Sequence, residues 1–146
     1  MAKRFQFNLE SVLKVRRARA DKTRREFAAV QRQVMDAQAR LAQYQALERE
    51  GKAVLADMSR KTLDIAQIRL QKQYLFAVAQ RIQISVQETQ GLEKQLDERR
   101  RVLIEDRRDE RAMELLREKR LEQYRYELDR AEQKILDDMK NPLSAR

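Results

Sequence analysis

Residues 27–47, FAAVQRQVMDAQARLAQYQAL, carry the spacing that decides the fold. Apolar side chains recur in this stretch at alternating steps of three and four residues, from Phe27 to Tyr44. A mean step of 3.5 is the signature of a coiled-coil seam, in which one helix packs against another with a left-handed supercoil. The stretch therefore predicts a long helix that needs a partner helix.

The same spacing continues beyond this stretch in both directions. It covers fifteen positions from Leu9 to Met58, and eleven of them are apolar. Two of the fifteen, Arg16 and Glu48, carry full charges, and such polar seam positions cost stability but can set the register. The positions of the predicted seam are Leu9, Leu13, Arg16, Ala20, Thr23, Phe27, Val30, Val34, Ala37, Leu41, Tyr44, Glu48, Gly51, Leu55 and Met58.

The start of this helix is marked by three kinds of residue. Asn8 is a good N-cap, because its side-chain oxygen can accept a hydrogen bond from an unpaired backbone N–H of the first turn. Phe7 and Val12 then stand at the two positions of a hydrophobic staple. Glu10 places negative charge at the positive end of the helix dipole. We expect the first helix to begin near Leu9.

A second apolar pattern follows a short break, and the two patterns together predict an all-α fold. We expect one long antiparallel two-helix coiled-coil hairpin, because a short connection makes consecutive helices antiparallel neighbours. With the turn centred near Arg60, Val34 faces residues 86 to 90. The predicted bounds are about 9–57 for helix one, about 58–63 for the connection and about 64–140 for helix two.

Capping residues cluster in the connection. Ser59 and Thr62 can both cap a helix, and Asp64 suits the first turn of the next one. At the far end of helix two, Asn141 precedes Pro142, and a residue before proline avoids helical angles. These signals place the two ends of helix two.

The two predicted helices differ in length. In the register centred on residue 60, residue 8 lies beside residue 112. The segment from Met113 to Lys140 then overhangs as a lone helix about 40 Å long. It still carries an apolar stripe, and a stripe without a partner in its own chain suggests a partner in another chain.

Composition removes several classes of function. The 146 residues include no Cys, no His and no Trp, and only two Gly and one Pro. Thiol chemistry and a histidine base are therefore absent, and the two glycines stand too far apart for a phosphate-binding loop. The longest uncharged run, Gln73 to Gln80, is too short for a membrane span. We expect a protein that is not an enzyme and holds no cofactor or metal.

The net charge of +9 is concentrated at one end. Residues 1–25 contain nine Lys and Arg but only Glu10 and Asp21 as acids. Nucleic acid is one possible partner, but a bZIP forks from a parallel zipper, whereas this chain predicts an antiparallel hairpin. The register also brings an acidic stretch beside the basic one, so we expect ion pairs from Glu105, Asp106, Asp109 and Glu110.

A membrane surface is a second possible partner for the basic end. Binding there needs a basic face opposite an apolar one. The cations nearly encircle the predicted helix, and the seam already uses its apolar stripe. A solvated and partly neutralised face is the commonest fate of such a run. The remaining possibility is a protein partner with an acidic cavity. Electrostatic attraction would then steer the docking of the two proteins.

Three stretches resemble the FliJ family, the small coiled-coil component of the bacterial flagellar type III export apparatus. In FQFNLESVLKVRRARADKTRREFA, a pattern of the family is filled by Phe7, Leu9, Val12, Leu13 and Arg16. YLFAVAQRI is similar to the start of the family's second helix. LREKRLEQYRYELDRAEQKILDDM is similar to its C-terminal stretch, through Glu132, Gln133, Lys134, Asp137 and Asp138. Injectisome stalk proteins share the fold and remain an alternative.

This resemblance implies an antiparallel hairpin like the central stalk of rotary ATPases. It implies docking in the hexameric flagellar export ATPase, with its regulator, and contact with the cytoplasmic domain of the export gate protein. It also implies help to export chaperones and a cytoplasmic location at the inner membrane. No small-molecule substrate is implied.

The resemblance and the charge pattern together give two sets of candidate residues. One of the residues given below for the export gate, Val78, is also a predicted seam residue of helix two. For the ATPase ring, the candidates are Lys14, Arg16, Arg17, Arg24, Arg25, Tyr124, Leu128 and Ile135. For the export gate, they are Tyr74, Val78, Arg81 and Ser85.

Overall fold

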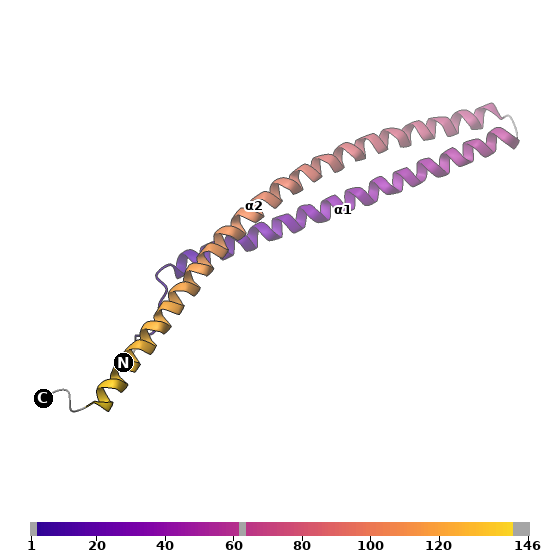
Figure 1. The fold of residues 1–146 in the computed structure, drawn as a ribbon. Coiled ribbons are helices and arrows are strands. Elements are labelled where there is room, and N and C mark those ends of the chain that lie inside the picture. The colour runs from indigo at the N-terminus through magenta and orange to yellow at the C-terminus, as the bar shows by residue number, and fades with distance from the viewer. Residues whose placement is uncertain (1–2, 62–63, 142–146) are drawn as a thin grey trace. The chain divides into compact units, whose positions relative to one another are not determined.

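The computed structural model describes residues 3–61 and 64–141. They form two helices, α1 (Glu10–Lys61) and α2 (Ile65–Lys140), and these described residues contain no strand. The two helices pack against each other in antiparallel directions (Figure 1). The all-α hairpin predicted from the seam is confirmed.

The chain divides into two compact units, and both helices pass from one into the other. The terminal unit consists of Met1–Lys22 and Leu103–Arg146, and the hairpin unit consists of Thr23–Val102. The hairpin unit contains the connection between the helices. The terminal unit contains the start of α1 and the second half of α2.

The predicted seam of α1 matches the burial of its side chains. All fifteen seam positions are buried or half-buried, whereas most positions between them are exposed. Leu13 is fully buried, and Val34 and Ala37 are 5% and 3% exposed. The 3.5-residue period therefore identified which face of α1 packs on α2.

The seam of α2 contains polar residues that an apolar pattern does not reveal. The predicted apolar positions Val78 and Met113 are buried, but so are Ser85, Thr89 and Asp106. The Thr89 hydroxyl donates to the Ser85 carbonyl at 2.8 Å, so this buried group is satisfied within its own helix. The seam of α2 therefore includes polar as well as apolar residues.

In the hairpin unit, α1 runs further than expected and α2 begins at a clear cap. Ser59 is not a cap, because its hydroxyl donates to the Leu55 carbonyl at 2.9 Å inside the helix. Asp64 is the N-cap of α2, since its Oδ1 accepts from the Ala66 N–H at 3.2 Å. Thr62 and Pro142, which were also expected to mark helix ends, lie outside the described residues.

The later end of α1 shifts the pairing register. If the centre of the turn moves by n residues, the residue of α2 that faces a given residue of α1 moves by 2n. Here α1 continues to Lys61, so the centre lies later than residue 60. Leu13, not residue 8, lies against Met113 in the terminal unit. In the hairpin unit, the partners of Glu26 and Gln38 are Arg99 and Glu93. The predicted placement of residue 34 against residues 86 to 90 was therefore too early in α2.

The start of α1 lies in a small aromatic core of the terminal unit. The chain enters through a turn, in which the Glu10 N–H donates to the Phe7 carbonyl at 3.1 Å. Phe7 packs with Leu13 and Met113 in this core, and not as a staple on Val12, which is 37% exposed. The entry angle of the helix is thus set by contact with α2.

Candidate partner-binding surfaces

The basic start of α1 faces carboxylates of α2 within the terminal unit. Every one of these pairs is partly open to solvent on at least one side, so each contributes little by itself. Together they place the basic start of α1 against carboxylates along one face of α2. The pairs are Arg16 with Asp109 at 3.7 Å, Arg17 with Glu114 at 3.7 Å, and Arg19 with Asp106 at 3.5 Å.

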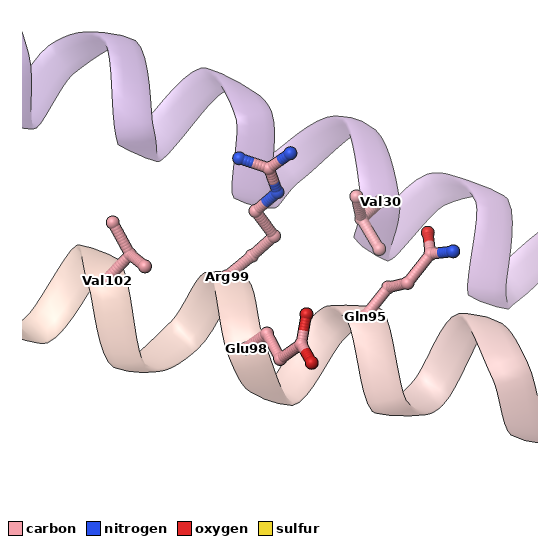
Figure 2. A pocket seen from close by; sticks show the side chains of 5 residues that line it. All are labelled: Val30, Gln95, Glu98, Arg99 and Val102. Atoms are coloured by element: carbon pink, nitrogen blue, oxygen red, sulfur yellow. The ribbon is translucent and has the colours of Figure 1, made fainter.

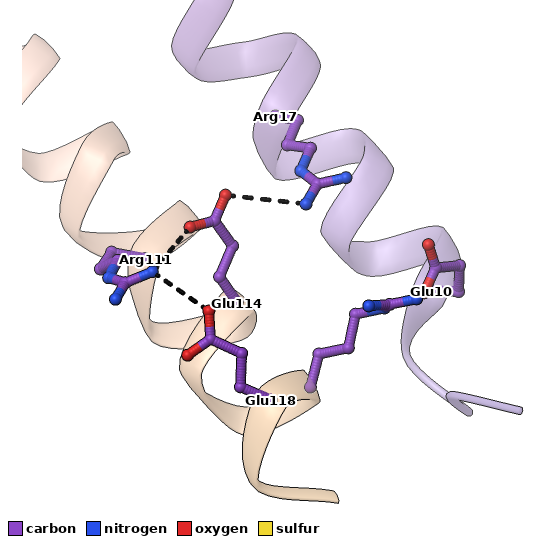
Figure 3. Close-up of polar contacts among 6 residues, drawn as sticks. Glu10, Arg17, Arg111, Glu114 and Glu118 are labelled. Carbon is purple, nitrogen blue, oxygen red and sulfur yellow. Dashed lines mark hydrogen bonds and ion pairs between the residues drawn. The ribbon is translucent and has the colours of Figure 1, made fainter. Parts of the chain in front are cut away.

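These pairs confirm the expected neutralisation for Asp106 and Asp109. Glu114 is shared, because Arg111 of the same helix also approaches its carboxylate, at 3.2 Å (Figure 3). Lys14 is exposed on the same helix end. Arg16 and Arg17 were expected to meet a partner protein, but each of them pairs with a carboxylate of its own chain.

Arg24 and Arg25 belong to the hairpin unit and are exposed. Both make an interaction within the chain. The predicted basic residues are therefore divided between the two units, and most of them interact with other residues of the chain.

Residues 3–7 form an extended strap along α2 in the terminal unit, and residues 8–9 turn from it into α1 (Figure 1). Their side chains alternate: Phe5, Phe7 and Leu9 are buried or half-buried, and the residues between them are exposed. Period-two alternation suits an extended segment, because successive side chains point to opposite sides. The sequence RFQFNL was interpreted only as a helix start, although its alternation also predicts a strap.

Aromatic and cationic contacts hold the strap on α2. The Phe5 ring lies 5.5 Å from the Tyr124 ring, and the Arg117 guanidinium lies 5.8 Å from the Phe5 ring centre. Arg120 approaches the Phe7 ring in the same way, at 5.7 Å. The Tyr124 hydroxyl donates to the Lys3 carbonyl. Tyr124, a candidate residue for contact with the ATPase ring, is thus partly covered by its own chain.

Beyond the strap, α2 carries an apolar stripe with no covering segment among the described residues. Leu128 is half-buried, and Ile135 and Met139 are 59% and 73% exposed. Steps of three and four residues place these side chains on the face that carries Met113 and Tyr124. We call this face the α2 stripe: Met113, Arg117, Leu121, Tyr124, Leu128, Ala131, Ile135 and Met139.

The start of α2 in the hairpin unit presents a second stripe. Leu70, Tyr74 and Ile84 are 65%, 43% and 49% exposed, and Ala77 and Arg81 lie on the same face. Each of these residues precedes a seam residue by one position, so the face is turned about 100° from the seam. We call these five residues the outer stripe.

The candidate gate residues divide between the outer stripe and the seam. Tyr74 and Arg81 belong to the outer stripe, but Val78 and Ser85 are only 6% and 7% exposed and pack in the seam. A partner can therefore touch Tyr74 and Arg81 directly. Leu70 and Ile84 were missed, although their spacing from Tyr74 and Arg81 could have found them.

A shallow hollow in the hairpin unit is formed by side chains of both helices, from Val30 of α1 and Gln95 to Val102 of α2 (Figure 2). Arg99 reaches across to Glu26 at 2.7 Å, and Arg100 approaches the Phe27 ring at 6.0 Å. Every charged group named here is engaged between the helices. The hollow is therefore explained by helix packing.

The family model of the flagellar FliJ protein matches residues 5–146. The chain belongs to the FliJ family. Comparison with curated proteins and with solved structures finds no match. Family membership makes the chain a component of the flagellar export apparatus and a protein of protein transport. It confirms the resemblance seen in the three sequence stretches, and it favours the flagellar over the injectisome alternative.

The FliJ match covers both candidate surfaces, since it includes the strap from Phe5 onward, the α2 stripe and the outer stripe. In residues 3–61 and 64–141, no three His, Cys, Asp or Glu side chains are placed to hold a metal ion. Over the same part of the chain, no helix combines the length and apolar character that a membrane span requires.

Proposed function

We propose that this chain is the stalk of the flagellar export apparatus, a coiled coil without catalytic activity of its own. It docks its terminal unit in the ring of the export ATPase and its hairpin unit on the cytoplasmic domain of the export gate. In this role it links ATP hydrolysis to secretion, with the ATPase regulator and export chaperones as further partners. It acts in the cytoplasm, at the inner membrane beneath the flagellum.

The observation that carries the ring contact is the exposed half of the α2 stripe. Ile135 and Met139 are large apolar side chains that a lone helix leaves in water, and burial against another protein is the favourable outcome. Charge plays a smaller part than the sequence suggested, because Arg16 and Arg17 pair with carboxylates of α2. Lys14 remains exposed for steering an approaching partner.

The outer stripe supports the gate contact. Tyr74 supplies an aromatic anchor with a polar end, and Arg81 supplies the only charge between residues 73 and 87. Leu70 and Ile84 extend the apolar surface on either side of them. Val78 and Ser85 lie in the seam next to the outer stripe and pack α2 on α1.

The ring contact is tested by co-purification with the cognate export ATPase, with and without nucleotide. Leu128→Ala together with Ile135→Ala should raise the dissociation rate, because apolar contacts mainly set how long a complex lasts. Leu136→Ala is the matched control, since Leu136 is 51% exposed but is turned about 100° from Ile135 around the helix. Equal loss in both variants would contradict a contact through the stripe.

The gate contact is tested separately with the cytoplasmic domain of the export gate. Tyr74→Ala with Ile84→Ala should weaken binding, while Phe76→Ala should not, because Phe76 is 67% exposed on another face. Salt-sensitive binding to duplex DNA at physiological ionic strength, without binding to the ATPase or the gate, would favour the nucleic-acid alternative instead.

A further inference from the structure

The strap covers only part of the α2 stripe. An extended chain advances about 3.3 Å per residue and a helix about 1.5 Å, so one strap residue spans roughly two residues of α2. The short strap therefore reaches from Met113, beside Phe7, to Tyr124, beside Phe5 and Lys3. The stripe continues beyond that point to Met139.

The two ends of the strap are held very differently. Phe7 is 8% exposed and belongs to the core with the fully buried Leu13, so this end is anchored. Phe5 is half-buried at the edge of that core, where its ring contacts Tyr124 and Arg117, and the Lys3 carbonyl accepts from the Tyr124 hydroxyl. Each such contact is comparable in strength with the chain entropy lost when a single residue is ordered.

We propose that residues 3–6 are a releasable cover on the α2 stripe, hinged at Phe7. In the free chain, Phe5 of this segment contacts Arg117 and Tyr124 of the stripe. They leave when a helix of a partner protein packs along the stripe from its exposed end. This inference rests on the proposed function for its partner, the export ATPase, but the cover itself is a property of this chain alone.

A helix is the partner that fits the stripe. Positions at steps of three and four residues form a straight row on α2, which is the surface that a second helix packs against. A partner helix on Leu128, Ile135 and Met139 that extends further along this row meets Tyr124 next, where Phe5 already lies. The partner and the strap therefore compete for one face.

Competition lowers the apparent affinity of the partner by the fraction of chains whose strap is open. Weakening the cover should raise that fraction and strengthen binding. A strap that instead belonged to the docking surface would have the opposite effect when it is weakened. The direction of the change thus separates the two roles.

The closed strap is tested first, without any partner. The chain has four Tyr but no Trp, so Phe5→Trp introduces a single tryptophan at the covered position, and its emission can be excited selectively. Its emission should be protected from a soluble quencher, whereas Gln6→Trp, on the exposed side of the strap, should be quenched freely. Equal quenching of the two would show that no cover exists and would overturn the proposal.

The release is tested by titrating the export ATPase against strap variants. Phe5→Ser should tighten binding by about two- to tenfold, the range expected from losing one aromatic contact that favours the closed state. Gln6→Ser should leave the affinity unchanged, since Gln6 is exposed. Thermal unfolding followed by circular dichroism confirms that both variants keep their helices.

Three further outcomes would overturn the release. Unchanged or weakened ATPase binding by Phe5→Ser would show that the strap does not compete, while the proposed function stands. Absence of ATPase binding by both the parent chain and Phe5→Ser would reject the proposed function and the release together. Added ATPase should also expose the Phe5→Trp fluorophore to the quencher, and continued protection in the bound chain would reject the release alone.

Discussion

The hairpin unit and the terminal unit use the same two helices but hold them together by different means. In the hairpin unit, seam residues such as Val34, Ala37 and Gly51 pack helix directly on helix, and Glu26 and Arg99 add one ion pair between them. In the terminal unit, an aromatic core around Leu13 and a row of ion pairs hold α1 to α2. A long coiled coil thus need not be uniform.

The difference follows from what each unit has available to bury. The hairpin unit has two helices of matching length, so helix packs on helix throughout. In the terminal unit α1 begins at Glu10, while α2 continues to Lys140. Aromatic residues of an extended strap replace the missing helix for part of that length.

The largest expected effect breaks the narrow seam of the hairpin unit. Val34→Asp places an unpaired charge at a position that is 5% exposed, and the free energy of unfolding should fall by about 3–5 kcal/mol. Met35→Asp is the control, because Met35 is 63% exposed. Thermal and urea unfolding measure both. A Val34→Asp chain as stable as the control would mean that this face does not pack on α2.

The next effect tests whether the aromatic core belongs to the terminal unit alone. Leu13→Ala should lower the free energy of unfolding by about 2–4 kcal/mol, because Leu13 is fully buried and leaves a cavity. Val15→Ala, at a 66% exposed position, should have little effect.

Hydrogen exchange shows where along α1 the Leu13→Ala substitution lowers stability. In Leu13→Ala, backbone amides of residues 10–22 should lose protection more than those of residues 30–55, because local opening follows the weakened contacts. Uniform loss of protection along α1 would contradict separate stabilisation of the two units.

A smaller effect tests the start of α2. Asp64→Ala removes the side chain that accepts from the Ala66 N–H, and it should cost about 1 kcal/mol. Asp64→Asn should restore most of the loss, since asparagine caps nearly as well. Urea unfolding compares the two variants, and equal stability of Asp64→Ala and the parent chain would show that the cap contributes nothing.

The smallest effect compares the two glycines, both in helices of the hairpin unit. Gly91→Ala should stabilise by about 0.5–1 kcal/mol, because a Cβ there meets open space and alanine favours the helix. At Gly51 an added Cβ would lie 2.6 Å from Leu75 Cδ2, so Gly51→Ala should gain less or lose stability. Thermal unfolding separates them, and an equal gain at both sites would argue against close approach at Gly51.

Much of this fold could be predicted from local pattern. The alternating steps from Leu9 to Met58 include every fully buried position of α1, because burial against one partner helix imposes one period on the whole length. The acidic residues Asp106 and Asp109 were correctly expected to pair with the basic start of α1. Both conclusions need only the spacing of residues along a helix.

The register could not be predicted to the residue. Ser59 offers a plausible cap in the sequence, but its hydroxyl is satisfied by the Leu55 carbonyl, and α1 continues to Lys61. The true cap, Asp64, was assigned only to the first turn. Cap residues compete for the same role, and only the folded chain shows which one the backbone uses.

The candidate surfaces were predicted in outline only. Tyr74 and Arg81 are open to a partner, but Val78 and Ser85 belong to the seam, because a helix turns 100° per residue and a small shift in phase changes the face. Tyr124 lies under the strap, and no pattern within α2 could reveal that contact, since its other half is more than a hundred residues away in sequence.

By itself, the sequence determined that this chain forms two long helices, which faces of them pack, and to which family it belongs. These properties depend on spacing and residue type, which are local. The tertiary structure alone decided the register, which basic residue meets which carboxylate, and the strap across Phe5 and Tyr124. Those properties depend on which distant groups meet, and several pairings of similar energy compete until the whole chain has packed.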